Sequence, residues 1–289
     1  MVNRIDGSID MTTEWLIGEN GLFRGSPARG WNRVGPYAYC INGIVRVGDA
    51  VVVGAETGCW RVPSEGRWVQ WHDESLTSVL AVAAAPVGVG IVAASAFGIA
   101  TGEADSPTGP VRWTPLSDPL PVNARYSNAI IADPSDPLRW FVGTEAGVLV
   151  REHAAGRWHF TSLADRPVHA LCAAAGVFWA GADGGVWRSA DGLSWARAGA
   201  GLDDAVVYSI AWTGDRLVAG IEGGLVVGDG EAPWERSGPA LRVRAVAAAA
   251  DAWLAGASPG GLWVSEDAGR RWRRSGEFVS VRTVVAEER

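Results

Sequence analysis

A tryptophan recurs along the whole chain at a nearly constant spacing, and this repeat limits the folds that the chain can adopt. The intervals between successive members are 37, 45, 45, 37, 39 and 38 residues. The members are Trp31, Trp68, Trp113, Trp158, Trp195, Trp234 and Trp272. Self-similarity at a period of about 40 residues is typical of repeat proteins, in which each period is one supersecondary unit. We therefore expect seven equivalent units.

A second pattern lies upstream of each tryptophan. It reads as an apolar run, an acidic residue with glycines and another apolar run, as in "WAGADGGVWRS" at 179–189 and "VAGIEGGLVVG" at 218–228. Acid-Gly and Gly-Gly pairs supply the positive φ angles of tight hairpin turns. A short apolar run before the hairpin, such as "VYSIAW" at 207–212, and the tryptophan segment after it complete four short strands without helical periodicity. The chain is therefore predicted to be an all-β, seven-bladed β-propeller of four-stranded antiparallel blades.

We expect the ring to close through a strand that joins the two ends of the chain. The first unit lacks a run resembling "VYSIAW", whereas "VSVRTVVAEER" at 279–289 supplies such a run with no hairpin after it. Residues 281–285 are thus predicted to be the inner strand of the first blade, which protects the sheet edges. Residues 1–289 then form a single domain. Its predicted blades are 281–289 with 12–38, then 39–75, 76–122, 123–165, 166–203, 204–240 and 241–280.

Composition excludes several classes of partner. The formal net charge is −7, and every basic residue is an arginine, which does not favour binding to a nucleic-acid backbone. No apolar run is long enough to cross a bilayer, and the first residues do not resemble a signal peptide. The three cysteines lack CxxC spacing, which argues against a disulfide framework or a cysteine zinc site. We therefore expect a cytoplasmic protein with no nucleic-acid or membrane partner.

The sequence contains few residues that could form a metal or cofactor site. The segment "WHDES" at 71–75 places His72 beside two acids, and such a group without spaced partners is more often a solvated loop than a metal site. His153 and His159 fall on outer strands or their turn. Every Gly-Gly pair belongs to a hairpin, so no glycine-rich loop leads into a helix that could hold a phosphate. We predict no metal and no cofactor.

One octapeptide carries a resemblance to a known family. "SEDAGRRW" at 265–272 matches the pattern S-x-D-x-G-x-x-W of the Asp-box (BNR) repeat, and "SADGLSW" at 189–195 matches it with one residue deleted. The chain thus resembles the Asp-box β-propellers, in which the box forms the turn between the third and fourth strands, away from the ligand face. An aspartate can cap the backbone of such a turn, and glycine permits the reversal. The resemblance implies structural roles for Ser265, Asp267, Gly269, Trp272, Ser189, Asp191 and Trp195.

That family includes sialidases, sortilin-like receptor domains and photosystem assembly factors, so the resemblance alone implies no single function. A sialidase needs three arginines for its substrate carboxylate, a tyrosine nucleophile with a glutamate, and an aspartic acid. "FRGSP" at 23–27 resembles part of the sialidase signature. However, the repeat aligns Phe23 and Arg24 with Trp187 and Arg188, on a third strand. Sialidase activity is therefore not expected.

Acidic residues of the hairpins converge on one face of the predicted propeller. They are Glu19, Glu56, Glu145, Asp183 and Glu222, and the third and seventh units lack the acid. One interpretation is that these residues only form turns beside glycine. The alternative is an acidic ring that binds a cation or supplies acid–base pairs.

Residues at the start of the inner strands converge on the same face. The phrases "VHALC", "VYSIA", "VRAVA" and "VRTVV" align His169, Tyr208, Arg244 and Arg282, with Asn42 and Asn128 as weaker matches. Arg125, Arg166 and Arg242 lie at neighbouring positions. One interpretation pairs these arginines with the hairpin carboxylates, as exposed ion pairs of little energetic consequence. The other makes Arg125, Arg166, His169, Tyr208, Arg244 and Arg282 a ligand-binding arc at the mouth of the channel.

Two functions fit this surface. The leading hypothesis is a non-catalytic interaction or assembly module that binds a protein segment or an anionic small molecule. The alternative is a hydrolase or lyase that acts on an anionic substrate, with Tyr208, Glu145 and Glu222 as candidate acid–base residues. The first is favoured because no nucleophile–base pair or metal-ligand set is visible, and a fold does not supply one. Glycan binding through tryptophans is less attractive, since the repeated tryptophans are explained as core.

Overall fold

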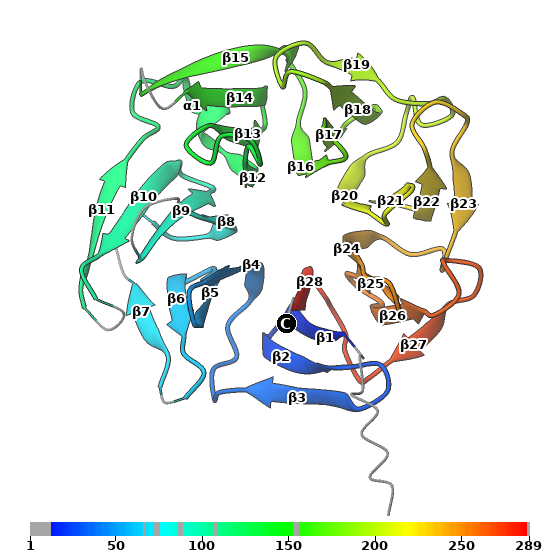
Figure 1. Cartoon of the computed structure of the whole chain (residues 1–289), viewed down its shortest axis with the longest axis horizontal. Coiled ribbons are helices and arrows are strands. Elements are labelled where there is room, and N and C mark those ends of the chain that lie inside the picture. Colours follow the sequence, from blue (N-terminus) through cyan, green and yellow to red (C-terminus); the bar gives the residue numbers. More distant parts are fainter. Residues whose placement is uncertain are drawn as a thin grey trace, which may run out of the picture.

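The protein is a ring of seven blades. The computed structural model describes residues 13–65, 67–71, 76–85, 89–106, 109–152 and 156–287. Seven four-stranded antiparallel sheets surround a central axis (Figure 1), which confirms the predicted all-β, seven-bladed propeller. A four-residue helix, α1 (Val122–Arg125), lies between the third and fourth blades, where the sequence predicted no helix. Within the described ranges, no helix has the length and apolar character needed to span a bilayer.

Each blade has an innermost and a second strand nearest the axis. The innermost strands, from blade one to blade seven, are β28 (Thr283–Glu287), β4 (Ile41–Val47), β8 (Val79–Ala84), β12 (Ser127–Ala132), β16 (Val168–Ala174), β20 (Val207–Trp212) and β24 (Val243–Ala248). The second strands are β1 (Glu14–Glu19), β5 (Ala50–Ala55), β9 (Val89–Ser95), β13 (Trp140–Thr144), β17 (Val177–Ala182), β21 (Leu217–Ile221) and β25 (Trp253–Ala257).

Two further strands complete each blade toward the outside of the ring. The third strands are β2 (Gly21–Ser26), β6 (Gly58–Val62), β10 (Ile99–Ala104), β14 (Gly147–Glu152), β18 (Gly185–Ser189), β22 (Gly224–Gly228) and β26 (Gly261–Ser265). The outermost strands are β3 (Gly30–Val34), β7 (Val69–Trp71), β11 (Val111–Pro115), β15 (Arg157–Ala164), β19 (Ala196–Arg197), β23 (Glu235–Ser237) and β27 (Arg273–Ser275).

The last strand of the chain closes the ring. β28 pairs with β1 in antiparallel register, from Gly18 opposite Thr283 to Glu14 opposite Glu287, so the predicted closure is confirmed. The strand begins two residues later than predicted. The Val281 amide donates to the carbonyl of Ala257 in blade seven at 3.1 Å, so this residue still belongs to the crossing between the blades.

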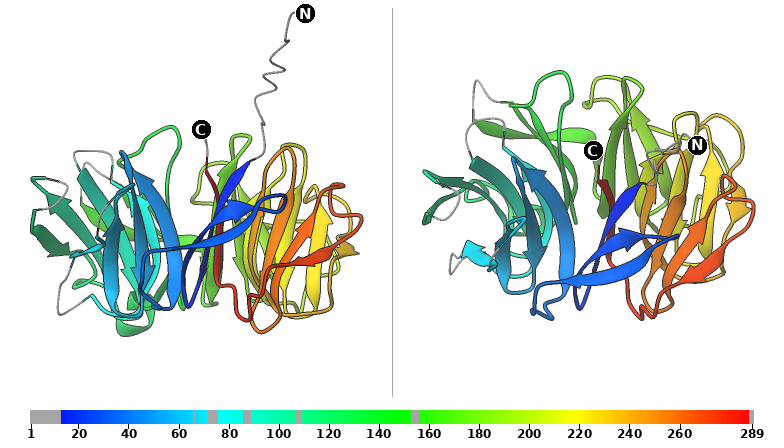
Figure 2. Two further views of the ribbon diagram at one scale, coloured as in Figure 1. Left: turned by 90° about the horizontal axis from the view of Figure 1, so that it is seen from below. Right: turned by 60° about the horizontal axis from the view of Figure 1, so that its bottom comes forward.

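The two faces of the ring carry different strand ends and turns. Every innermost strand begins at the same face, together with the hairpin between the second and third strands of its blade; we call this the cavity face. Glu14, at the start of β1, is paired with Glu287, at the end of β28. Both of these strand ends lie at the opposite face of the ring (Figure 2). The turns between third and fourth strands also lie at that opposite face.

The hydrophobic core is divided among the interfaces between blades. Seven clusters of buried apolar side chains occur in the described residues, and each joins two consecutive blades. One repeated tryptophan lies in or against each cluster. The tryptophan repeat therefore records seven equivalent blade interfaces, each of which needs a large side chain where the blades diverge.

Several of these indoles also donate a hydrogen bond to the preceding blade. Trp234 Nε1 donates to the carbonyl of Ala198 at 2.9 Å, and Trp158 Nε1 donates to the carbonyl of Leu116 at 2.8 Å. Trp31 Nε1 reaches Ser275 Oγ at 2.9 Å, across the boundary where the ring closes. These bonds orient the indole while its carbon surface fills the interface.

The two box-like motifs form turns with the same hydrogen bonds. In the turn between β26 and β27, Ser265 Oγ accepts from the Gly269 amide at 2.8 Å, and Asp267 Oδ1 accepts from the Arg271 amide at 2.8 Å. Trp272 Nε1 donates to the Gly269 carbonyl at 3.0 Å. A Cβ on Gly269 would lie 2.7 Å from the ring of Trp253, and its φ of 81° favours glycine.

The shorter motif, between β18 and β19, reproduces this arrangement. Asp191 Oδ1 accepts from the amides of Leu193 and Ser194, both at 2.8 Å, and from Ser189 Oγ at 2.9 Å. Trp195 Nε1 donates to the Gly192 carbonyl at 3.0 Å. The backbone donors hold the pKa of the Asp191 carboxyl at about 2. These contacts are those of a turn, at the face opposite the cavity face.

The closure predicts that removal of residues 283–289 destabilises the whole ring. This deletion takes away an innermost strand and exposes sheet edges, so we expect a melting temperature lower by roughly 10 °C or more, or loss of a cooperative transition. Circular dichroism melts measure the effect. Removal of residues 288–289 alone is the control, since β28 ends at Glu287. A truncation at 282 that melts like the full chain would contradict the closure.

The low pKa of Asp191 predicts a specific acid sensitivity. The folded-state pKa of about 2 lies below the ordinary value of an aspartate, so the stabilisation is fully present above about pH 4 and is lost as the pH falls toward 2. Asp191→Asn should therefore flatten the fall in the free energy of unfolding between these pH values. Urea titrations at several pH values measure it. Asp204→Asn, at an exposed carboxylate, is the control for the removal of one negative charge.

Candidate functional site

A β-bulge near the start of the innermost strands points one side chain per blade toward the axis. The register shifts between Val207 and Ser209 in β20, and the other innermost strands from β4 to β24 shift at the equivalent place. A bulge leaves one residue outside the ladder and redirects its side chain. The bulged residues are Asn42, Leu80, Asn128, His169, Tyr208 and Arg244. Arg282, directly before β28, is their counterpart in blade one.

All seven of these side chains line one cavity at the mouth of the central channel. Its volume is about 310 Å³. Tyr126 and Ser258 complete the lining. The structure thus brings together His169, Tyr208, Arg244 and Arg282, as the alignment of the strand phrases predicted, and adds the two weaker matches, Asn42 and Asn128. Leu80, Tyr126 and Ser258 were not selected from the sequence, although "VLAVA" at 79–83 aligns Leu80 with Tyr208.

In three consecutive blades the cavity residue is hydrogen-bonded to the hairpin acid of its own blade. The sequence predicted these hairpin carboxylates on the same face. In these three blades each carboxylate is hydrogen-bonded to the side chain that lines the cavity. The pairs are Asn128 Nδ2 with Glu145 Oε1 at 2.9 Å, His169 Nε2 with Asp183 Oδ1 at 2.9 Å, and Tyr208 Oη with Glu222 Oε2 at 3.0 Å.

Blades seven and one depart from this pairing. In blade seven the hairpin carries Ser258 where blade six carries Glu222. In blade one Glu19 is present, but Oε1 accepts from the backbone amides of Val279 at 2.5 Å and Ser280 at 2.8 Å. The acid of one blade is therefore missing, and the acid of the other is committed to the chain closure.

Arg244 and Arg282 consequently lack a carboxylate partner among the described residues. The guanidinium of Arg244 lies over the ring of Tyr208, 5.0 Å from its centroid, and Arg282 Nη1 donates to Asn42 Oδ1 at a long 3.4 Å. Both side chains are exposed. Two exposed guanidinium groups from neighbouring blades line one cavity, and planar guanidinium forks suit a carboxylate or phosphate.

The protonation of Tyr208 and Glu222 limits what this pair can do chemically. Arg242 donates to both oxygens of Glu222, at 2.6 and 2.9 Å, and with the Tyr208 hydroxyl holds the pKa of Glu222 below its usual range. Burial and the same carboxylate raise the pKa of Tyr208. A weakly basic carboxylate and a protonated phenol form a poor base and a poor nucleophile at neutral pH.

Two arginines expected at the cavity lie elsewhere. Arg125 donates to the carbonyls of Leu120 at 3.0 Å and Asp118 at 2.9 Å, because α1 turns it back toward the connection between blades. Arg166 stacks on Trp187 at 4.8 Å. Neither lines the cavity, so their predicted place in the arc is corrected. Arg24 also lies away from the cavity, on β2, where its Nε is 2.7 Å from Glu287 Oε2.

Of the histidines considered as metal ligands, only His159 lies in the described part of the chain, and it is not among the residues that line the cavity. His72, the two acids after it and His153 lie outside the described residues. His159 is exposed on β15. Within the described part of the chain, no three His, Cys, Asp or Glu side chains are grouped to hold a metal ion.

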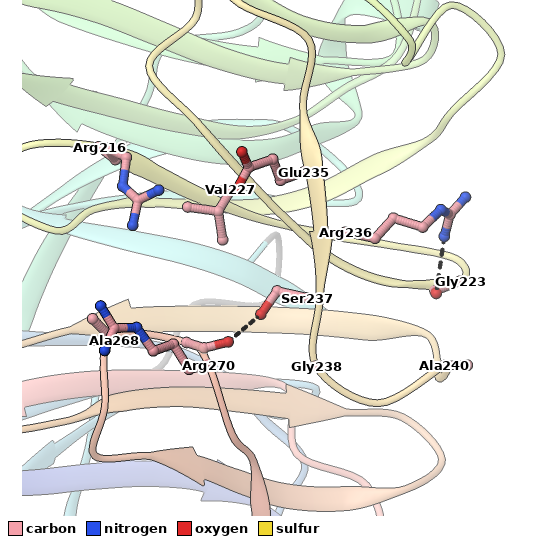
Figure 3. A pocket seen from close by; sticks show the side chains of 11 residues that line it. Arg216, Gly223, Val227, Glu235, Arg236, Ser237, Gly238, Ala240, Ala268 and Arg270 are labelled. Atoms are coloured by element: carbon pink, nitrogen blue, oxygen red, sulfur yellow. Dashed lines mark hydrogen bonds between the residues drawn. The ribbon is translucent and has the colours of Figure 1, made fainter.

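A second hollow lies on the outer side of blades six and seven. This groove, of about 740 Å³, runs beside β23 and the turn between β26 and β27 (Figure 3). Figure 3 shows Arg216 and Arg270 on one side of the groove and Arg236 on the other. Neither Arg216 nor Arg270 forms a side-chain ion pair with a described residue. Arg216 and Arg270 therefore provide a control pair with the same charge as the two arginines of the cavity.

Comparison with known proteins supports the fold. No protein-family model and no curated protein sequence matches the chain. Its structure is similar to the extracellular domain of a B. thetaiotaomicron protein described as a hybrid two-component system, with a TM-score of 0.72, 16% identity, and coverage of 89% of this chain and 38% of that chain. The chain thus spans less than half the length of that protein.

Two further solved structures give the same result. The β-propeller domain of Cps50 (Swd1) from Myceliophteria thermophila has a TM-score of 0.64 and 12% identity, over 87% of this chain and 96% of that one. An ancestral GH74 enzyme has a TM-score of 0.63 and 18% identity, over 81% of this chain and 38% of that one. At these identities the likeness shows the propeller fold alone.

The contact between Tyr208 and Glu222 predicts a measurable shift in the titration of the phenol. Glu222→Gln removes the negative charge that disfavours the phenolate, so the pKa of Tyr208 should fall toward its ordinary value; burial still keeps part of the shift. The phenolate absorbance reports it, with Tyr208→Phe identifying the signal. Glu145→Gln, which alters the partner of Asn128, should leave this titration unchanged. An unaltered pKa in Glu222→Gln would contradict the contact.

Proposed function

We propose that this chain is a binding module whose cavity at the channel mouth holds an anionic group of a protein segment or small molecule. The observation that supports the proposal is the pair Arg244 and Arg282, which line one cavity without a carboxylate partner in the described part of the chain. Their mutual repulsion is relieved by a bound anion. Asn42, Asn128 and Ser258 add hydrogen-bonding groups around the same cavity.

We also propose that the chain is an Asp-box propeller. The full motif at 265–272 and the shortened one at 189–195 form turns with matching serine, aspartate and tryptophan hydrogen bonds. The sequence between β22 and β23 has diverged, yet Asp229 Oδ1 still accepts from the amides of Glu231 at 2.9 Å and Ala232 at 3.0 Å. The same turn chemistry thus persists where the motif is degenerate.

An enzyme acting on an anionic substrate at this cavity is the second candidate. The observation that favours it is the bond of His169 to Asp183, since an oriented imidazole can transfer a proton, and its ring lies 5.6 Å from that of Tyr208. The lowered pKa of Glu222 disfavours it. Mass spectrometry of each bound anion after incubation separates the two, because only an enzyme changes the mass of its ligand.

The proposed function predicts an anion-dependent rise in melting temperature that requires both arginines. The probes are mono-, di- and tricarboxylates and inorganic phosphate. A ligand at about 100 times its Kd adds roughly 2.7 kcal/mol to the free energy of unfolding. The parent should respond, whereas Arg244→Ala, Arg282→Ala should not. The unliganded double variant should melt no lower than the parent, since two repelling charges are removed.

The control variant is Arg216→Ala, Arg270→Ala, which removes the same charge from the outer groove. It should respond to the anions like the parent. If both double variants respond alike, the arginines of the cavity are not the binding site. If only the control loses the response, the anion binds in the groove of Figure 3 instead.

A further inference from the structure

Exposed apolar side chains gather on the cavity face. Among the described residues, six large apolar side chains are strongly exposed, and four of them lie on this face. The four are Phe97, Val122, Tyr126 and Val279, and the other two are Phe160 and Leu193. Exposed apolar groups that gather near a cavity are typical of an interaction site.

Three of the four form an arc from blade three to the start of blade four. Phe97, 63% exposed, lies in the hairpin between β9 and β10; the Ala96 amide there donates to the Ser78 carbonyl at 3.2 Å, beside the start of β8. Val122, 82% exposed, is the first residue of α1. Tyr126 follows α1 and lines the cavity itself. Leu80, in the same lining, continues the apolar surface inward.

This apolar arc lies across the channel from the unpaired arginines. Arg244 and Arg282 belong to blades seven and one, and in a ring of seven the blade opposite their boundary is blade four. Figure 1 shows β12 of blade four across the axis from β24 and β28. The cavity therefore has a cationic side, and the side across from it combines Leu80 and Tyr126 with Asn128. A ligand that contacts the arginines and the apolar arc must be anionic at one end and apolar beyond it.

The size of the cavity indicates how much of the ligand it holds. A volume of about 310 Å³ is at the lower end of small-molecule sites. Phe97 and Val122 are outside its lining, so the apolar surface extends past the cavity over blades three and four. An occupant that covers this surface is longer than the cavity and enters it with its anionic end.

We propose that the occupant is the C-terminal segment of a partner protein. Its terminal carboxylate lies between Arg244 and Arg282, its last apolar side chains pack against Leu80 and Tyr126, and the preceding residues leave over Phe97 and Val122. Terminal carboxylates are a recurring anchor for peptide recognition. This inference rests on the proposed function. It adds that the bound group is the C-terminus of the partner and that the partner segment runs outward over blades three and four.

The test uses fluorescein-labelled hexapeptides with random apolar residues at the last three positions, with either a free C-terminal carboxylate or a C-terminal amide. We expect free-acid peptides to bind in fluorescence polarisation, and amidation to weaken binding about tenfold or more, because charge-assisted contacts are lost. Phe97→Ser, Val122→Ser should weaken peptide binding several-fold and leave the thermal response to small carboxylates intact. The control Phe160→Ser, Leu193→Ser removes two exposed apolar side chains elsewhere, 49% and 41% exposed, and should bind like the parent.

The outcomes separate this inference from the proposed function. If small anions bind through Arg244 and Arg282 but free-acid peptides bind no better than amides, the C-terminal segment is wrong and the anion site remains. The proposed C-terminal segment is also wrong if C-terminally amidated peptides that carry an internal Asp or Glu bind as tightly as the free-acid peptides. If Phe97→Ser, Val122→Ser binds peptides like the parent, the proposed path over blades three and four is wrong. If neither anions nor peptides respond to the arginine substitutions, the proposed function itself fails.

Discussion

The packing of one indole between each pair of neighbouring blades is the contact on which the rest of the structure depends. Four-stranded blades diverge with distance from the axis, so a ring of them leaves a wedge that only a large side chain fills. The repeated tryptophans occupy all seven wedges, including the boundary between blades seven and one, where Trp31 packs near Phe278 and bonds to Ser275. That contact joins blade one to blade seven, beside the pairing of β28 with β1 that closes the ring.

The bulge at the start of the innermost strands lines the mouth of the channel with one side chain per blade and so forms the candidate site. Two residues after each bulge the side chain is aliphatic, as with Ile44, Val82 and Ile210, which are almost fully buried. The seven side chains at the bulge positions therefore lie at one level of the channel. The strands position them, and several also contact the neighbouring blade, as in the bond of Asn42 to the Val79 carbonyl and of Arg282 to Asn42.

The fold was predictable because each repeat carries redundant signals, namely hairpin glycines, the apolar runs and a tryptophan, all required by the same packing. Part of the site followed from the same alignment, since His169, Tyr208, Arg244 and Arg282 occupy one repeat position. Arg125 was misplaced because α1 is an insertion that no repeat matches, and it turns the side chain to the Leu120 and Asp118 carbonyls. Leu80 and Tyr126 carry no charge or motif that marks them in the sequence, and they enter the cavity only as apolar surface.

The asymmetry of the cavity follows from how the ring closes. In blades four to six the hairpin acid bonds to the cavity residue of its own blade. In blade one the incoming C-terminal segment presents two free backbone amides, at Val279 and Ser280, and Glu19 is the acceptor for both. Glu19 Oε1 is therefore occupied by the closing segment, and the hydrogen bond of Arg282 goes to Asn42. The two arginines without a carboxylate partner among the described residues thus lie where Glu19 bonds to the closing segment and where blade seven has Ser258 at the position of the hairpin acid.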